Sequence, residues 1–150
     1  MDGLMTTAPA LPASLADIRE EFLAVGTRDR LLLLLDFAGQ LPPLPPHLAD
    51  RPDLLERVTE CQAPVFVSAE IEDGIVHVLA QAPEEAPTTR GFASVLVQGL
   101  SGLPVEQVLA VPDDYPQMLG LDEAVSPLRV RGMSGLLARI KRRLRARSAV

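Results

Sequence analysis

Two short runs of alternating apolar and polar residues, VFVSAEI (65–71) and IVHVLAQ (75–81), flank the dipeptide Asp73-Gly74. An Asp-Gly pair between two such runs is the strongest local signal for a β-hairpin, because both turn positions need positive φ. The preceding run LLERVTE (54–60) predicts a third and weaker strand. The sequence therefore predicts a small antiparallel sheet in the middle of the chain, around which the other elements must pack.

Apolar residues at helical spacing occur on both sides of this predicted sheet. Residues 15–25 and 27–41 predict two helices, with Ser14 and Thr27 as their N-caps. Later helical segments are predicted at 88–100 with Thr88 or Thr89 as the cap, at 103–111, at 115–121, and from Pro127 onward with Ser126 as the cap. Helices, then a small antiparallel sheet, then helices predict an α+β domain.

The segment LPPLPPHLADRP (41–52) holds five prolines in twelve residues. Proline removes a backbone donor, so we expect neither helix nor central strand here but a stiff, extended connection. A polyproline ligand for an SH3-type groove is the alternative function for this segment.

Length and composition favour one domain. At 150 residues the chain has the commonest domain size, and we expect a flexible N-terminal segment (1–13), a single domain (14–147) and a short tail (148–150). The first residues show no export signal, and the apolar run LLLLLDFAG is too short to cross a bilayer. A cytoplasmic location is therefore expected.

Charge is distributed unevenly along the sequence. The net charge is −6, and all 20 acidic residues lie at or before Glu123. Six basic residues are concentrated at the end of the chain: Arg139, Lys141, Arg142, Arg143, Arg145 and Arg147. The remaining eight basic residues leave the rest of the chain at −12, which opposes nucleic-acid binding. We expect the basic end to be the solvated face of a helix, with RNA or an anionic membrane as the alternative partner.

Motifs of the common enzyme classes are absent. The sequence contains no phosphate loop, dinucleotide loop, zinc-binding H-E-x-x-H helix or G-x-S-x-G nucleophile elbow. His47 and His77 are too scattered to predict a metal site. The single cysteine, Cys61, excludes an internal disulfide and is the one plausible nucleophile. It is either a small apolar core residue or a reactive thiol, and its polar, turn-like neighbours Glu60, Gln62 and Pro64 favour the second.

The surroundings of Cys61 resemble a known family. The stretch ERVTECQAPVFVSAEIEDGIV (56–76) is similar to the V-x-G-C-Q-S-x-V-[WF] segment and following two-stranded ribbon of the SufE family. Three further stretches are similar in the same order: RLLLLLDFAGQLPPLP, EEAPTTRGFASVLVQGLSGLPVEQVL and LGLDEAVSPLRVRGMSGLLARIK. The resemblance covers about residues 15–143. It implies an α+β fold like that of SufE and IscU, with a three-stranded antiparallel sheet packed against helices.

The resemblance also implies a function. SufE proteins are small cytoplasmic proteins that accept sulfur from a cysteine desulfurase during iron–sulfur cluster assembly. The implied acceptor is Cys61, which would carry the sulfur as a persulfide. The implied partners are a SufS-like desulfurase, which holds the pyridoxal phosphate, and a SufBCD-like scaffold complex. The chain itself would need no cofactor and would act as a monomer or a weak homodimer. A non-catalytic binding module and a thiol redox sensor remain the alternatives.

The sequence departs from the family pattern close to the cysteine. Glu60 stands where the family has glycine, and Ala63 where it has serine. A carboxylate beside Cys61 should disfavour its thiolate. Supporting positions implied by the resemblance are Gln62, Glu60, Glu85, Arg90 and Arg129, the two arginines assisting docking or orienting the Cys61 segment.

Overall fold

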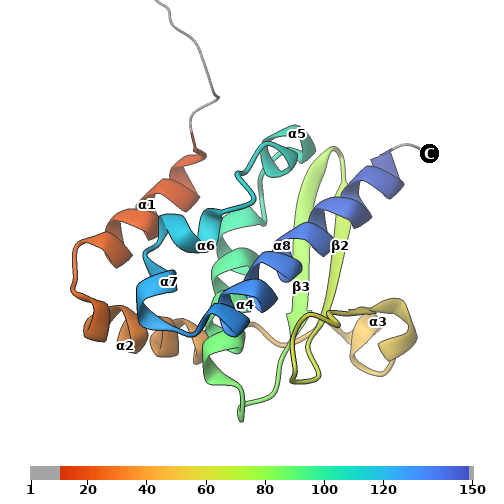
Figure 1. The fold of residues 1–150 in the computed structure, drawn as a ribbon. Helices are drawn as coiled ribbons and strands as arrows, with labels where there is room; N and C mark the ends of the chain where they lie inside the picture. The colour runs from red at the N-terminus through yellow and green to blue at the C-terminus, as the bar shows by residue number, and fades with distance from the viewer. Residues whose placement is uncertain (1–10, 149–150) are drawn as a thin grey trace, which may run out of the picture.

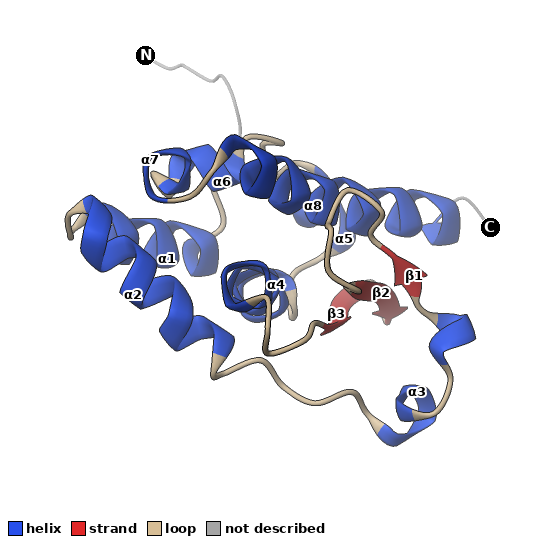
Figure 2. Cartoon of the chain, turned by 60° about the horizontal axis from the view of Figure 1, so that its bottom comes forward, coloured by secondary structure: helices blue, strands red, loops and turns tan. Residues whose placement is uncertain are grey.

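The computed structural model describes residues 11–148 as one sheet surrounded by helices. The sheet has three antiparallel strands in the order β1-β2-β3 (Figures 1 and 2). The elements are α1 (Ala13–Leu23), α2 (Thr27–Ala38), α3 (Pro46–Ala49), η2 (Pro52–Leu54), β1 (Glu56–Arg57), β2 (Phe66–Glu72), β3 (Ile75–Gln81), α4 (Pro87–Leu100), α5 (Val105–Leu109), α6 (Tyr115–Met118), α7 (Leu121–Ala124) and α8 (Pro127–Ser148). The predicted α+β class and three-stranded sheet are confirmed.

The β2–β3 hairpin is built as its sequence predicts. Asp73 and Gly74 adopt φ of 54° and 79°, the positive values that a two-residue hairpin turn requires. Val67 pairs with Ala80, and Ala69 with Val78. These four side chains are buried on the same face of the sheet, because residues two apart in a strand point to the same side.

Helix α4 occupies the centre of the molecule. It lies between α2, the sheet and α8, as the end-on view shows (Figure 2). The sequence predicts one apolar side for this helix, but its small residues Gly91, Ala93, Ser94 and Gly99 are buried as well. Neighbours cover most of the circumference of this helix, and small residues there permit close contact with them.

Three of the four predicted N-caps are wrong. Ser14 lies inside α1 and donates to the carbonyl of Gly99 (2.7 Å) instead of capping the helix. Thr27 is the first residue of α2, and α4 begins at Pro87, so neither Thr88 nor Thr89 stands before a helix. The fourth cap is confirmed, because the Ser126 hydroxyl accepts a hydrogen bond from the Arg129 backbone N–H (3.4 Å).

The proline-rich segment is only partly extended. Two short helical turns, α3 and η2, lie within or beside it, so the prediction that helix is excluded there is wrong. Each turn has proline at its start, where a backbone N–H would have no partner within the helix, so the absence of that N–H costs no hydrogen bond. His47 in α3 shares a hydrogen bond with Glu70 of β2 (2.9 Å), which places this connection beside the sheet.

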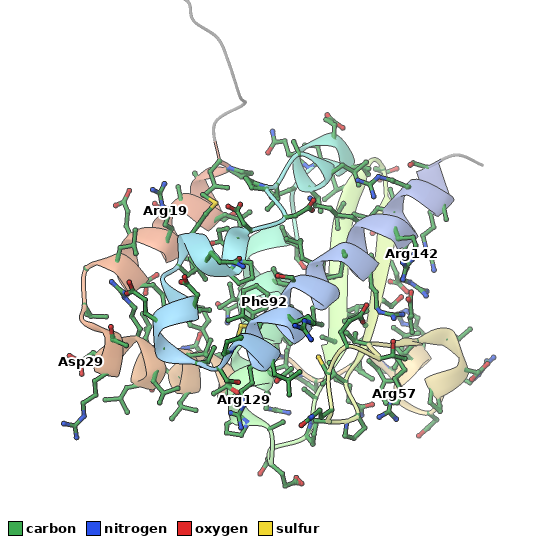
Figure 3. The ribbon with its side chains drawn as sticks, viewed as in Figure 1. Arg19, Asp29, Arg57, Phe92, Arg129 and Arg142 are labelled. Carbon is green, nitrogen blue, oxygen red and sulfur yellow. The ribbon has the colours of Figure 1, made fainter. Side chains whose placement is uncertain are left out.

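The basic end of the chain is not a solvated face throughout. Lys141 is 3% exposed and donates to Asp113 (2.7 Å) and to the carbonyl of Val111. Arg139 is also covered, and its carboxylate partners belong to the candidate site below. Arg142 is exposed, and in Figure 3 it lies toward the far end of α8 from Arg129. The acidic body and the basic helix are therefore in contact.

The expected chain ends lie largely outside the described residues. Of the predicted flexible segment 1–13 and tail 148–150, the structure describes only residues 11–13 and 148; α1 begins at Ala13 and α8 ends at Ser148. Within residues 11–148, no helix combines the length and apolar character that crossing a membrane requires.

Candidate functional site

The loop that joins β1 to β2 carries the single cysteine. This Cys61 loop (residues 58–65) is closed at its base by a hydrogen bond from the Val58 N–H to the Val65 carbonyl (2.8 Å). Inside this loop, the Cys61 N–H donates to the Val58 carbonyl (3.1 Å) and closes a tight turn. The predicted position of Cys61, at a turn leading into the hairpin, is confirmed.

Helix α8 covers this loop through two glycines. A Cβ at Gly132 would lie 3.1 Å from the Cys61 sulfur, and one at Gly135 would lie 2.8 Å from the Glu60 Cβ. Both glycines therefore allow the loop to approach the helix more closely than any larger residue would. The Cys61 thiol donates to the Gly132 carbonyl (3.7 Å), and the residue is only 7% exposed.

A cavity of about 340 Å³ opens beside Cys61, between its loop, the start of α4 and the start of α8. Cys61, Gln62, Glu60, Glu85 and Arg129 all line it, which are five of the six site residues predicted from the sequence. Thr88 lines it too and accepts a hydrogen bond from the Arg129 guanidinium (3.0 Å).

Arg90 is the sixth predicted residue, and the structure does not bring it to this cavity. Its guanidinium donates to the backbone carbonyls of Ala38, at the end of α2, and Ala82, after β3. In this position Arg90 connects the end of α2 to the segment that follows β3. His47 and His77 also lie away from the cavity.

Arg139 of α8 forms a charged cluster at the base of the Cys61 loop. Its guanidinium donates to Glu60 (2.7 Å), Glu56 (2.6 Å) and the Thr59 hydroxyl (2.7 Å). We call Glu56, Thr59, Glu60 and Arg139 the Arg139 cluster. It connects β1, the Cys61 loop and α8 through one side chain.

The environment of Cys61 favours the neutral thiol. Burial raises the pKa of the thiol to about 11, and the neighbouring Glu60 carboxylate contributes in the same direction. Arg139 opposes both effects, but it does not offset them. At pH 7 a pKa of about 11 leaves on the order of one thiolate in ten thousand molecules. In this conformation, therefore, the sulfur is both covered and unreactive.

Sequence reasoning missed the contribution of α8 to this site. The charge pattern predicts Arg139 in solvent, and no motif points to Gly132 or Gly135. A signal was nevertheless present: two glycines three apart inside a predicted helix lie on one face and indicate a close approach by another segment. Arg139 lies four residues after Gly135 and therefore continues the same face.

Comparisons with known proteins agree with the sequence resemblance. Residues 16–144 match the SufE family, described as an Fe-S metabolism associated domain. An uncharacterized SufE-like protein of Mycobacterium tuberculosis is 51% identical over 142 residues, covering 94% of this chain and 98% of that protein. A chloroplastic/mitochondrial SufE-like protein 1 of Arabidopsis thaliana is 32% identical over 85% of this chain and 33% of its own length.

A more distant relative and a solved structure complete the comparison. The cysteine desulfuration protein SufE of Plasmodium vivax is 29% identical over 67% of this chain and 39% of that protein. The solution structure of a hypothetical protein from Thermus thermophilus superposes with a TM-score of 0.82 at 38% identity, covering 94% of this chain and all of that one. On the family match and the extent of these similarities, the chain belongs to the SufE family.

Proposed function

We propose that this protein accepts a sulfur atom from a cysteine desulfurase on Cys61 and stimulates that enzyme, as part of iron–sulfur cluster assembly. The observation that carries the proposal is the cavity beside Cys61, which is lined by five of the six residues that the family resemblance selects. Membership of a family associated with Fe-S metabolism supports it. So does the name of the Plasmodium relative, a cysteine desulfuration protein.

The chemistry proposed is thiol exchange without net oxidation. The Cys61 thiolate attacks the outer sulfur of a persulfide on the desulfurase. A bond forms between the Cys61 sulfur and that outer sulfur, while the sulfur–sulfur bond of the desulfurase breaks and its cysteine leaves as a thiolate. The product is a persulfide on Cys61. This chain supplies the nucleophile and needs no cofactor, because the pyridoxal phosphate belongs to the partner.

Burial of the thiol sets a condition on this reaction. Only the thiolate is nucleophilic, and the thiol of a residue that is only 7% exposed cannot reach a persulfide on another protein. The partner must therefore bind a conformation in which the Cys61 loop has left α8. We propose that Arg129 and Gln62, both exposed at the cavity, contact the SufS-like desulfurase in that complex. Transfer onward to a SufBCD-like scaffold, and a cytoplasmic location, remain predictions from the family resemblance.

The first prediction tests Cys61 directly. Incubation with a cysteine desulfurase and free cysteine should add one sulfur atom to the wild-type chain, measured by intact-protein mass spectrometry under non-reducing conditions. Cys61→Ser should gain no sulfur and should not stimulate the desulfurase. The hydroxyl is nearly isosteric and can still donate to the Gly132 carbonyl, so we expect a stability loss of about 1 kcal/mol. Wild-type protein that remains at its original mass would overturn the proposal.

Two alternative functions predict different results for Cys61. Burial of Cys61 is the observation that favours a binding module, in which the thiol is only a core residue; Cys61→Ser would then retain full binding and stimulation. A redox sensor would gain oxygen rather than sulfur on exposure to peroxide. The raised pKa and low exposure of Cys61 disfavour that function, since oxidation follows thiolate character and access.

A further inference from the structure

One face of α8 is shaped to hold the Cys61 loop. Gly132, Gly135 and Arg139 lie three and then four residues apart, so they share one side of the helix. The two glycines lie under Cys61 and Glu60, and Arg139 follows one turn later beside Glu60. The contact of this loop with α8 thus combines close backbone approach at one end with a charged group at the other.

Arg139 uses three of its nitrogen atoms on three different residues. The acceptors are Glu56 in β1, Thr59 and Glu60, and the arginine side chain is only 15% exposed. Hydrogen bonds between ionised groups are about twice as strong as neutral ones, and covered pairs are little weakened by salt. Glu60 and Thr59 immediately precede Cys61, so the loop cannot leave α8 without breaking at least two of these contacts.

We propose that Arg139 is a positioning residue that holds the Cys61 loop against α8 and thereby sets how often the thiol is exposed. The bond from Arg139 to Glu60 is the part of the cluster that must break when the loop opens. Glu60 occupies the position where the family pattern has glycine, so the bond between Arg139 and Glu60 is not part of that pattern. Its role in sulfur transfer rests on the proposed function, but the opening of the loop does not.

Several charges lie around the loop and must be considered together. Glu56 and Glu60 face Arg139, while Arg142 and Arg143 of α8 also approach Glu56 (3.1 and 3.6 Å). On the cavity side the charged residues are Glu85 and Arg129. Removing Arg139 therefore has two opposite effects on reactivity: the loop opens more often, but the thiolate loses a neighbouring positive charge. A readout that does not depend on thiol ionisation is needed to separate them.

Hydrogen exchange of the full-length chain provides that readout. We compare wild type with Arg139→Gln and with the control Arg142→Gln. The control removes the same charge from the same helix and from the same Glu56 partner, but the wild-type Arg142 forms no hydrogen bond or ion pair with Thr59 or Glu60. Exchange in residues 58–65 at pH 7 should be about tenfold faster in Arg139→Gln, because charge-assisted bonds across the opening are lost. In Arg142→Gln it should stay within about twofold of wild type. Protection of α4 should be equal in all three proteins.

Unchanged exchange of the loop in Arg139→Gln would overturn the proposal, as would an equal rise in the control or a rise that extends to α4. A second variant covers the case in which Arg139→Gln fails to fold. Glu60→Gln removes the negative charge of one partner at a residue that is partly exposed, which weakens its hydrogen bond with Arg139, and it keeps the Arg139 contacts with Glu56 and Thr59. Exchange in residues 58–65 should be faster than in wild type in this variant too, because the loop opens more often. The alkylation rate of Cys61 by iodoacetamide should also rise about tenfold at pH 8, since opening increases and a neighbouring negative charge is removed. An unchanged rate and pH midpoint would contradict the proposal.

Both experiments use the isolated chain, so they are independent of the desulfurase. If wild type takes up no sulfur while the exchange and alkylation differences hold, the proposed function fails and the role of Arg139 stands. If sulfur uptake succeeds while loop exchange is insensitive to Arg139, the proposed function stands and the role of Arg139 fails. When both hold, Arg139→Gln should reach half-maximal stimulation at a lower concentration than wild type, because less of the partner's binding free energy is used to open the loop.

Discussion

At the scale of single residues, Cys61 shows how burial and chemistry conflict. Its sulfur contacts α8 closely enough to belong to the apolar core, yet the proposed reaction requires it as a solvent-accessible thiolate. Desolvation is the larger cause of its raised pKa, and the Glu60 carboxylate is the smaller one. Opening the loop removes the larger cause at once, so exposure and ionisation of the thiol are coupled to the same motion.

The raised pKa makes a prediction about stability at high pH. A thiol whose pKa is about 11 when folded and about 8.5 when unfolded stabilises the folded state fully below pH 8.5, and this contribution declines as the pH rises toward 11. Between pH 7 and pH 10 the wild-type chain should lose about 1–2 kcal/mol more unfolding free energy than Cys61→Ser. Urea unfolding of both proteins at the two pH values measures the difference.

Tyr115 does not confuse this comparison. Burial also raises the pKa of its hydroxyl, which donates to the Leu15 carbonyl (2.8 Å), so it too weakens the fold at high pH. It is present in both proteins, and its contribution cancels in the difference. Parallel pH profiles for wild type and Cys61→Ser would show that the thiol is not held neutral by the fold.

The residue scale is also where sequence reasoning about the site succeeded most. Cys61, Gln62, Glu60, Glu85 and Arg129 were selected from motif resemblance and converge on one cavity. The burial of the thiol was not foreseen, because Glu60, Gln62 and Pro64 indicate a polar turn. What covers the thiol is a helix about 70 residues later, and local composition holds no information on such a contact.

At the scale of elements, α2 and α4 approach each other closely at Gly91. A Cβ at Gly91 would lie 2.2 Å from the Leu34 carbonyl oxygen, a backbone atom that cannot rotate away. Gly99, in the same helix, would instead meet the end of the Leu15 side chain at 2.5 Å, which can change rotamer. The packing of α4 therefore requires glycine at position 91, whereas a change in the Leu15 rotamer can make room for a larger residue at position 99.

This difference predicts unequal effects for two identical substitutions. Gly91→Ala should lower the unfolding free energy by about 1–3 kcal/mol or more, because the helices must separate. Gly99→Ala should cost less, since the gain in helix propensity of about 1 kcal/mol partly offsets the movement of Leu15. Urea unfolding at neutral pH measures both. Equal losses in the two variants would mean that the α2–α4 contact relaxes as easily as a side chain does.

The sequence predicted which elements form better than it predicted where each element begins and ends. The hairpin turn was correct because Asp73-Gly74 has few alternatives to the conformation it adopts. The helix caps at Ser14 and Thr27 were wrong because a serine or threonine hydroxyl is equally satisfied by a distant backbone carbonyl or by solvent, and Ser14 takes the carbonyl of Gly99. The proline segment forms a turn of helix because Pro46 lies in the first turn, where the lack of a backbone N–H removes no hydrogen bond of the helix.

At the scale of the whole molecule, the sequence separates acidic and basic residues, and the fold reunites them. Helix α8 runs across the sheet, so its basic residues reach carboxylates far earlier in the chain (Figures 1 and 3). Arg139, Arg142 and Arg143 surround Glu56, and Lys141 pairs with Asp113. The net charge of each part was readable from the sequence, but the pairing depends on tertiary contacts.

These pairs predict how the protein responds to acid. Burial alone would raise the pKa of Glu56, but hydrogen bonds from Arg139 and Arg142 lower it overall, and Arg139 likewise lowers the pKa of Glu60. A carboxyl with a depressed folded pKa stabilises the fold fully above its unfolded value near 4.3, and this contribution is lost as the pH falls below it. Stability should therefore decline between pH 5 and pH 3.

Glu56 should account for much of that decline, because it is the least exposed of these carboxylates and three arginines approach it. Glu56→Gln should be less stable than wild type at pH 7 by about 1–3 kcal/mol, and the gap should narrow toward pH 3, where the wild-type carboxyl is also neutral. The control is Asp114→Asn, at an exposed acid that makes no ion pair with a residue in 11–148. Its pH profile should run parallel to that of wild type. A gap between wild type and Glu56→Gln that stays constant from pH 7 to pH 3 would show that Glu56 stabilises α8 through shape and hydrogen bonding rather than through charge.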